Sequence, residues 1–184
     1  MHVPGDTDLR DSDLRDSDLR DSESFLNVID ANKGIIYKVA NAYCRDNENR
    51  KDLIQEITAQ LWLAFPKYDD RFMLSTWMYR IALNVSISFY RKETKRNKLN
   101  QPLTAEIISL ITEDAPFDAN SELSLLHRFI RELKEFDRAL ILLYLEDRSQ
   151  QEIADILGIS ISNVSTKVAR IKEQLRQKFS ILKS

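Results

Sequence analysis

Residues that interrupt helices or cross-link chains are scarce in this sequence of 184 residues, which has three glycines, four prolines and one cysteine. The scarcity of glycine and proline favours helices over most of the chain. A single cysteine cannot form an intramolecular disulfide, so we expect Cys44 to be a small buried side chain. No apolar run reaches the roughly 20 residues of a membrane span, and the N-terminus lacks an apolar signal region. These absences predict an all-α, cytoplasmic protein without direct membrane insertion.

Metal ligands and nucleophiles are equally scarce. The only histidines are His2 and His127, and the sequence has no H-x-x-x-H or C-x-x-C spacing and no glycine-rich phosphate loop. The adjacent acidic pairs at 69–70 and 113–114 are typical of solvated loops rather than of paired catalytic carboxylates. We therefore expect no metal, no cofactor and no catalytic residue, and the hypothesis of an enzyme has little support.

Charge is distributed unevenly along the chain, although the formal net charge is only −2. Residues 1–24 contain eight acidic residues against three arginines, which leaves the rest of the chain with a positive balance. Basic residues gather at 91–98, with five against one acidic residue, and at 167–183, with six against one. Two basic patches, one in each half, are typical of a protein that contacts nucleic acid at two places.

The acidic N-terminal segment contains DLRDS three times, starting at Asp8, Asp13 and Asp18. A period of five advances a helix by about 500°, so the leucines would form no stripe, and a strand needs a period of about two. We therefore predict a disordered acidic tail over residues 1–23. Two alternatives stay open: a tail that mimics DNA and masks a basic surface, and a translated repeat from a misplaced start site.

Apolar residues recur at helical spacing in three segments of the first half, at about 24–43, 48–65 and 76–95. They predict a helical bundle over residues 24–98. Its expected core includes Phe25, Ile36, Val39, Leu53, Ile57, Leu61, Trp62, Met78 and Ala82. Residues 99–120 contain two prolines and a weaker pattern, which predicts a linker with a possible short helix at 105–111. Helices are then expected at 121–136 and 137–147, within a second helical domain over residues 121–184.

The second domain contains the most informative local pattern, SQQEIADILGISISNVSTKVARIKEQLR at 149–176. Ser149 and Glu152 form an S-x-x-E capping box for a first helix, and Gly158 suits the left-handed backbone that ends it. In the second helix, one buried stripe is formed by Val164, Val168, Ile171 and Leu175. This pattern predicts a DNA-binding helix-turn-helix, with an ordinary pair of packed helices as the simpler alternative. The polar face holds the candidate DNA contacts, which are Ser162, Asn163, Thr166, Lys167 and Arg170.

A second candidate surface lies on the helix expected at 76–95. Arg80, Asn84 and Arg91 fall within roughly 60° of one another at 100° per residue, opposite the buried stripe, with Trp77 at the border. Arginines, an amide and an aromatic ring are able to hold a nucleic-acid backbone and to bind an unpaired base. Taken singly, these residues suit a core tryptophan and solvated arginines, but their alignment favours a binding face.

Three segments, in this order, resemble the bacterial extracytoplasmic function (ECF) sigma factors of the sigma-70 family. They are DLIQEITAQLWLAFPKY at 52–68, FMLSTWMYRIALNVSISFYRK at 72–92 and FDRALILLYLEDRSQQEIADILGISISNVSTKVARIKEQL at 136–175. The resemblance extends from about residue 24 to residue 179. It implies two small helical domains, the region-2 bundle and the region-4 helix-turn-helix domain, joined by a linker. It also implies that the protein directs core RNA polymerase to promoters and assists DNA melting.

The resemblance further implies roles for individual residues. The polymerase clamp helices would be contacted by Asp52, Leu53, Gln55 and Glu56. The minus-ten promoter element would be recognised by the loop at 67–75 together with Trp77, Arg80, Asn84 and Arg91. Region 4 would read the minus-thirty-five element near the polymerase flap, and Arg170 matches an arginine of the family. The sequence departs from the family at two places: it has VSTK at 164–167 where V-K-S-R is frequent, and Phe136 where proline is frequent. We therefore expect its promoter preference to differ from that of other members.

Other hypotheses remain beside this one. The family implies an anti-sigma factor as a further partner. A stand-alone helix-turn-helix regulator is the alternative, and it would bind a DNA fragment without polymerase. A protein adaptor is a third hypothesis, and it would leave no DNA footprint even when polymerase is present.

Overall fold

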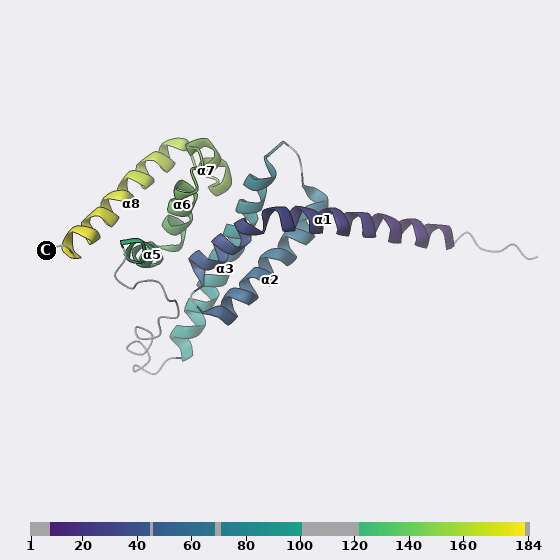
Figure 1. The fold of residues 1–184 in the computed structure, drawn as a ribbon, viewed down its shortest axis with the longest axis horizontal. Coiled ribbons are helices and arrows are strands. Elements are labelled where there is room, and N and C mark those ends of the chain that lie inside the picture. The colour runs from purple at the N-terminus through teal and green to yellow at the C-terminus, as the bar shows by residue number, and fades with distance from the viewer. Residues whose placement is uncertain (1–7, 45, 69–70, 101–121, 183–184) are drawn as a thin grey trace, which may run out of the picture.

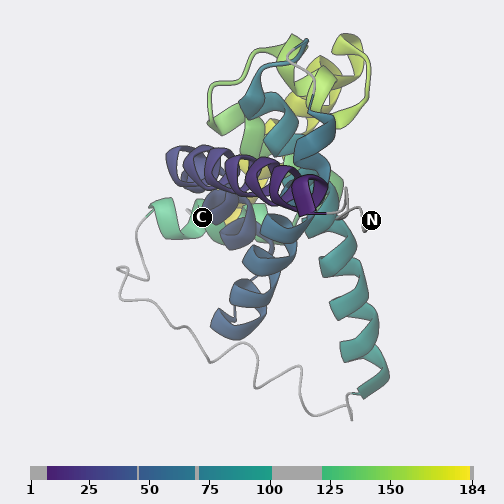
Figure 2. The same cartoon turned by 90° about the vertical axis from the view of Figure 1, so that its right-hand side faces the viewer.

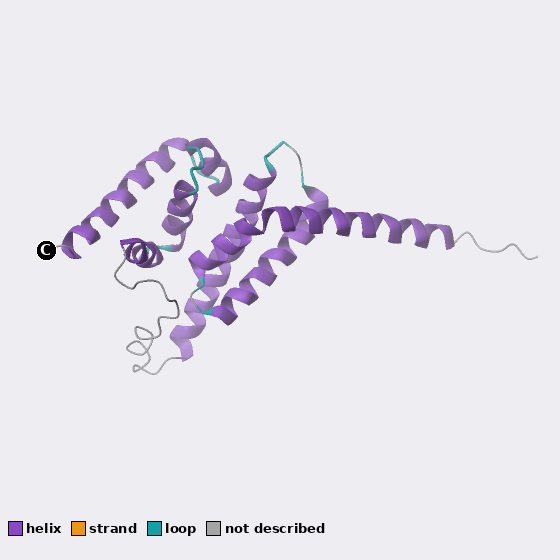
Figure 3. Cartoon of the chain, viewed as in Figure 1, coloured by secondary structure: helices purple, strands orange, loops and turns teal. Residues whose placement is uncertain are grey.

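The computed structural model describes residues 8–44, 46–68, 71–100 and 122–182, and all regular structure within these segments is helical (Figure 3). The first half contains α1 (Asp8–Tyr43), α2 (Asn47–Ala64), the short 3-10 helix η1 (Phe65–Lys67) and α3 (Leu74–Asn100). The second half contains α5 (Glu122–Glu132), α6 (Glu135–Leu145), α7 (Gln150–Leu157) and α8 (Ile161–Leu182). The expectation of an all-α protein with two helical parts is confirmed. The predicted linker lies almost entirely outside the described residues.

The first half is a bundle in which α1, α2 and α3 pack against one another (Figures 1 and 2). Asp46 begins α2 by accepting a hydrogen bond from the backbone N–H of Asn49 at 2.8 Å. Pro66 lies in η1, directly after α2, where its lack of a backbone N–H interrupts no hydrogen bond of α2. Most residues expected in the core are buried, but Trp62 is 40% exposed. The expectation that Trp62 lies in the core is therefore wrong. Its apolar spacing on α2 predicts burial, but the apolar stripe of α2 is wider than the surface that α1 and α3 cover.

The N-terminal repeat differs from the prediction of a disordered tail, because α1 already begins at Asp8 and continues to Tyr43. Its first turns extend beyond the bundle (Figure 1). The repeat contains a helical signal besides its leucine pattern. Asp11 precedes Arg15 by four residues and Asp16 precedes Arg20 by four, a spacing and order that favour a helix.

In the second half, α6, α7 and α8 surround an apolar centre, and α5 packs against α6 and α8. This centre includes Leu140, Leu143, Ile153, Val164 and Ile171, each of which is almost completely buried. Phe129 of α5 and Phe179 of α8 meet edge to face, with their ring centroids 5.0 Å apart. The helices expected at 121–136 and 137–147 are thus present, with their boundary shifted to the turn between Glu132 and Glu135.

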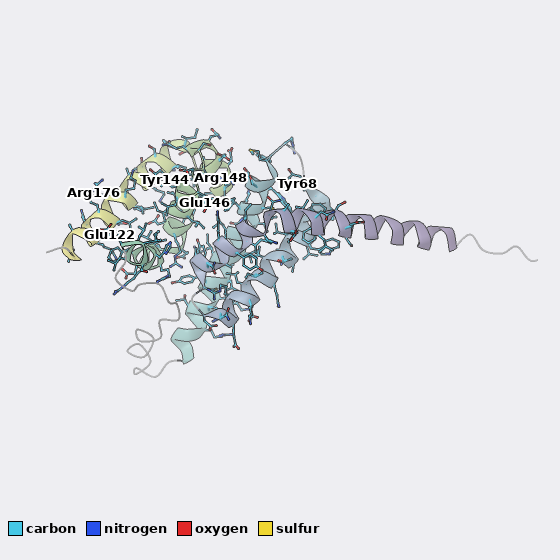
Figure 4. The ribbon with its side chains drawn as sticks, viewed as in Figure 1. Tyr68, Glu122, Tyr144, Glu146, Arg148 and Arg176 are labelled. Atoms are coloured by element: carbon cyan, nitrogen blue, oxygen red, sulfur yellow. The ribbon has the colours of Figure 1, made fainter. Side chains whose placement is uncertain are left out.

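The two halves are in direct contact through α1 and α3 on one side and α6 and α7 on the other. Glu146, just after α6, accepts a hydrogen bond from Lys38 of α1 at 2.5 Å. Arg148 donates to the Ser75 hydroxyl at 3.2 Å, and its guanidinium lies 5.1 Å from the ring centroid of Tyr79. Figure 4 shows Glu146 and Arg148 where the second half faces the bundle. Polar contacts therefore accompany apolar packing across this junction.

Arg138 of α6 is the most deeply buried charged residue at the junction, with 2% of its surface exposed. Its guanidinium lies between the rings of Tyr43 and Tyr90, at 5.1 and 4.7 Å from their centroids. It donates hydrogen bonds to the backbone carbonyls of Ala42, Arg131 and Leu133. A buried arginine that is hydrogen-bonded and enclosed by aromatic rings links the two halves.

Among the described helices, none has the combination of length and apolar composition that a membrane span needs.

Candidate nucleic-acid interface

The turn between α7 and α8 has the geometry that the sequence pattern predicts. The capping box is present: the Ser149 hydroxyl accepts from the Glu152 N–H at 3.2 Å, and the Glu152 carboxylate accepts from the Ser149 N–H at 2.9 Å. The hydrogen bonds that the Glu152 carboxylate accepts from the N–H and the hydroxyl of Ser149 lower its pKa below the usual range, since they favour the charged form. Gly158 ends α7 with φ 67° and donates its N–H to the Ala154 carbonyl at 2.8 Å.

The conformation of Gly158, rather than crowding, is what requires glycine there. A Cβ atom at this position would meet no heavy atom within 4 Å, whereas its positive φ is unfavourable for residues with side chains. Ser160 then caps α8 by accepting a bond from the Asn163 N–H at 3.3 Å. These local contacts set α8 at a defined angle to α7 and thereby present its outer face.

The two faces of α8 are divided as expected. The predicted apolar stripe, Val164, Val168, Ile171 and Leu175, is buried. Ser162, Asn163, Thr166 and Arg170 are exposed on the outer face, and Lys167 is half-buried at its edge. The Thr166 hydroxyl donates to the Ser162 carbonyl at 2.9 Å, which leaves its oxygen lone pairs facing outward as acceptors. The face combines short polar side chains with basic ones.

The basic residues of this face rest on the first turn of α6. Arg170 forms an ion pair with Asp137 at 2.8 Å, and the Lys167 ammonium lies 5.6 Å from the ring centroid of Phe136. Asp137 was not predicted from the sequence to be part of this surface. No local spacing connects residues 33 positions apart, so the pair depends on how α6 packs on α8.

The second candidate face lies along α3. Arg80 and Asn84 are exposed, and Trp77 is half-buried. The Trp77 ring packs against Tyr68 and Phe65, with centroid separations of 5.1 and 6.5 Å. The packing expected of a core tryptophan is thus confirmed in part, and the binding role of Trp77 stays a prediction.

Arg91, the fourth residue expected on this face, reaches across to the second half. Its Nε donates to the Glu135 carboxylate at 2.7 Å. This hydrogen bond is the main cause that lowers the pKa of Glu135 below its ordinary range. In the structure Arg91 is therefore engaged at the junction, whereas Arg80 and Asn84 remain accessible.

The outer side of α2 presents the other predicted binding residues. Asp52, Gln55 and Glu56 are exposed, but Leu53 is completely buried. Leu53 therefore anchors α2 in the bundle and does not itself reach a partner. Beside Gln55, an apolar groove between α1 and α2 is lined by Ser22, Phe25, Leu26, Ile54, Thr58, Ala59 and Trp62. The groove was not predicted from the sequence, because Phe25, Ile54 and Trp62 have the helical spacing of core residues.

Within the part of the chain that the structure describes, no group of three or more histidine, cysteine and acidic residues is arranged to hold a metal ion. The single cysteine, Cys44, is buried, and burial raises the pKa of its thiol to about 11. The features that remain are two exposed polar faces with basic residues and one acidic-apolar surface on α2.

Comparison with known proteins identifies both halves. A family model described as Sigma-70 region 2 matches residues 28–96, and one described as Sigma-70, region 4 matches residues 123–175. The ECF RNA polymerase sigma factor SigW of Bacillus subtilis (strain 168) is 24% identical over 165 residues, which are 84% of this chain and 88% of SigW. The RNA polymerase sigma factor SigV of the same organism is 26% identical over 149 residues, which are 80% of this chain and 86% of SigV.

Solved structures support the same fold. CnrH, in complex with the cytosolic domain of CnrY, has a TM-score of 0.62 at 19% identity, covering 87% of this chain and 90% of that chain. The sigma factor RpoE of Bartonella quintana, in complex with the anti-sigma factor NepR, has a TM-score of 0.60 at 19% identity, covering 87% and 96%. From the two family models and the curated relatives, the chain belongs to the sigma-70 family and is an RNA polymerase sigma factor of the ECF type.

Proposed function

We propose that this sigma factor directs core RNA polymerase to promoters by reading the minus-thirty-five element with α8 and the minus-ten element with α3. The observation that carries this proposal is the presence of two exposed polar faces with basic residues, one on each half of the chain. A single helix-turn-helix suits a stand-alone regulator equally well. A second face able to bind an unpaired strand favours a protein that also acts where promoter DNA opens.

In region 4, α8 would lie in the major groove with its N-terminal turns against base edges. The short side chains of Ser162 and Thr166 allow close approach, and Arg170 supplies a guanidinium that suits the acceptor edge of guanine. Asn163 and Lys167 would contribute amide and backbone contacts. The VSTK sequence at 164–167 places serine and threonine where the family often has lysine and serine, so base preference is expected to differ from that of relatives.

In region 2, the face on α3 would bind the minus-ten element after its strands separate. Arg80 and Asn84 are exposed and one turn apart, so they are able to contact the backbone and the edge of one unpaired base. Trp77 lies one turn before Arg80 and is half-buried, and we propose that its ring stacks on an unpaired base. Tyr68 donates its hydroxyl to the Phe72 carbonyl at 2.9 Å, which ties together the ends of the preceding loop. Capture of unpaired bases favours the open promoter without any hydrolysis by this chain.

Core polymerase would hold both halves at the separation that a promoter requires. Asp52, Gln55 and Glu56 on α2, next to the apolar groove, are the residues proposed to contact the clamp helices, and region 4 is proposed to lie near the flap. Each DNA contact alone is weak and salt-dependent, but a second contact on the same tethered chain gains from its high local concentration. We also propose regulation by an anti-sigma factor, since RpoE of Bartonella quintana was solved with one, and action in the cytoplasm with polymerase.

Transcription in vitro with purified core polymerase on a promoter library tests the proposal. The wild-type chain is expected to select a defined pair of elements, and footprinting is expected to show no protection when polymerase is omitted. Arg170→Ala should weaken recognition of the upstream element by roughly 5- to 100-fold, the value of one arginine–guanine contact. Asn84→Ala should reduce promoter opening, measured by permanganate reactivity of unpaired thymines.

Matched controls lie on the same helices. Ser88 is exposed one turn beyond Asn84, and Arg176 is exposed beyond Arg170. Ser88→Ala and Arg176→Ala should therefore change opening and upstream selection much less. If both test variants melt the promoter as the wild type does, the assignment of these faces is wrong. A specific shift of a DNA fragment without polymerase would instead favour the stand-alone regulator.

A further inference from the structure

We propose that Asp137 is a positioning residue for promoter recognition, one that holds the Arg170 guanidinium in the orientation with which it reads the upstream element. This inference rests on the proposed function of α8. It adds a residue of α6, outside the helix-turn-helix, to the determinants of specificity.

The ion pair has an asymmetric environment. The Asp137 side chain is 12% exposed, whereas the Arg170 side chain is 53% exposed. Asp137 also lies in the first turn of α6, where the helix dipole favours a negative charge. The carboxylate is therefore a fixed point in the protein surface, and the arginine is the mobile member that it orients.

The guanidinium keeps most of its hydrogen-bonding capacity in this arrangement. Arg170 uses its Nη2 for the bond to Asp137 at 2.8 Å. A guanidinium has five N–H donors in one plane, so the remaining donors are able to face a base or a phosphate. A long side chain that is already held in one plane loses less freedom when it binds, which raises its discrimination between bases.

The neighbouring residue of α6 acts on the same face. Lys167 lies over the Phe136 ring, so two consecutive residues of α6 contact two basic residues of α8. This pairing differs from an adventitious surface salt bridge, in which both partners are exposed and mobile. The first turn of α6 thus forms a platform, Phe136 and Asp137, beneath the basic part of the recognition face.

A positioning role and a purely structural role give opposite results when the charge is removed. Asp137→Asn keeps the shape but removes a negative charge near DNA, so affinity for non-specific DNA should rise and its salt dependence should become steeper. At the same time, preference for the base pair read by Arg170 should fall by about tenfold. If Asp137 only stabilised the fold, both specific and non-specific binding would decrease together.

The experiment uses the full chain with core polymerase, a library randomised in the upstream element, and non-specific duplex binding measured over a range of salt concentrations. Asp137→Asn is expected to lose selectivity at the same base pair as Arg170→Ala, and the double variant should lose no more than Arg170→Ala alone. Glu173→Gln is the matched control, because Glu173 forms an exposed pair with Arg176 on the same helix. This variant should keep the wild-type selectivity.

Thermal melts report whether Asp137→Asn disturbs the fold. If it does, Arg170→Lys carries the test, because it keeps the charge at an exposed position and loses only the planar fork. It should then reproduce the loss at that base pair. Unchanged selectivity in Asp137→Asn, or losses that add in the double variant, would overturn the positioning role. A wild-type chain that initiates at no library promoter would overturn the proposed function itself.

Discussion

The Arg138 contact permits a quantitative test of how the two halves are held together. We consider Arg138→Met, which keeps much of the apolar stem and removes the guanidinium. The change removes hydrogen bonds to the carbonyls of Ala42, Arg131 and Leu133, together with two aromatic contacts. At about 1 kcal/mol for each hydrogen bond and about 0.5 kcal/mol for each ring contact, the expected loss of unfolding free energy is about 4 kcal/mol.

Urea unfolding followed by circular dichroism measures this loss, and a chain of this size should also melt roughly 10 °C lower. Arg138→Lys should lose about half as much, because an ammonium keeps a ring contact but cannot reach three carbonyls in one plane. Arg128→Ala serves as the control, since Arg128 forms an exposed i,i+4 pair with Glu132 at 3.6 Å, and the change should cost less than about 0.5 kcal/mol.

A loss below about 1 kcal/mol for Arg138→Met would contradict a stabilising role of Arg138, because it would mean that water replaces the guanidinium at no cost. Equal losses of unfolding free energy for the Met and Lys variants would mean that an ammonium at this position stabilises the fold no more than a methionine side chain does. That result would contradict the stabilising role assigned to the ring contacts. Arg138 therefore probes the junction through Ala42 and the two tyrosine rings, and the turn between α5 and α6 through Arg131 and Leu133.

Four further results are expected. Gly158→Ala should destabilise the chain by about 1 kcal/mol in urea unfolding, because φ is positive there although space is free, and Gly158→Asn should cost less. Ser149→Ala should cost about 1 kcal/mol through loss of the cap. The pKa of Glu152 is lowered in the folded state, so its contribution to the free energy of unfolding is complete above its unfolded pKa and is lost as pH falls through the folded pKa. The stability difference between wild type and Glu152→Gln should therefore shrink on acidification. A difference that stays constant with pH would contradict this. Cys44 should react with iodoacetamide at pH 8 only after unfolding, since burial raises its pKa to about 11, and rapid labelling of the folded chain would refute its burial.

Local features of this protein could be predicted well. Ser149, Glu152 and Gly158 act within one or two turns of chain, and the structure confirms the capping box and the left-handed turn that they predict. The apolar stripe of α8 is confirmed as well. Such features depend on neighbouring residues, whose geometry a helix sets by itself.

Other expectations were wrong where they rested on the spacing of apolar residues alone. The N-terminal repeat was expected to be disordered because its leucines form no stripe, but its charges have helical spacing and α1 begins at Asp8. Trp62 was expected in the core, but α1 and α3 leave 40% of it exposed. Its exposure depends on how much of α2 its neighbours cover, which the pattern of α2 alone does not contain.

Periodicity and capping residues act locally, so the helical class, the division into two halves, the helix-turn-helix and the polar faces of α3 and α8 could all be predicted from the sequence. Which side chains meet across the chain depends on how the helices pack. Arg138 lies between Tyr43 and Tyr90, Arg91 pairs with Glu135, and Asp137 holds Arg170. The partners are at least 33 residues apart in the sequence, and all of them except Asp137 and Arg170 lie in different halves. Their contacts follow from helix packing over long separations, where no local period specifies a partner.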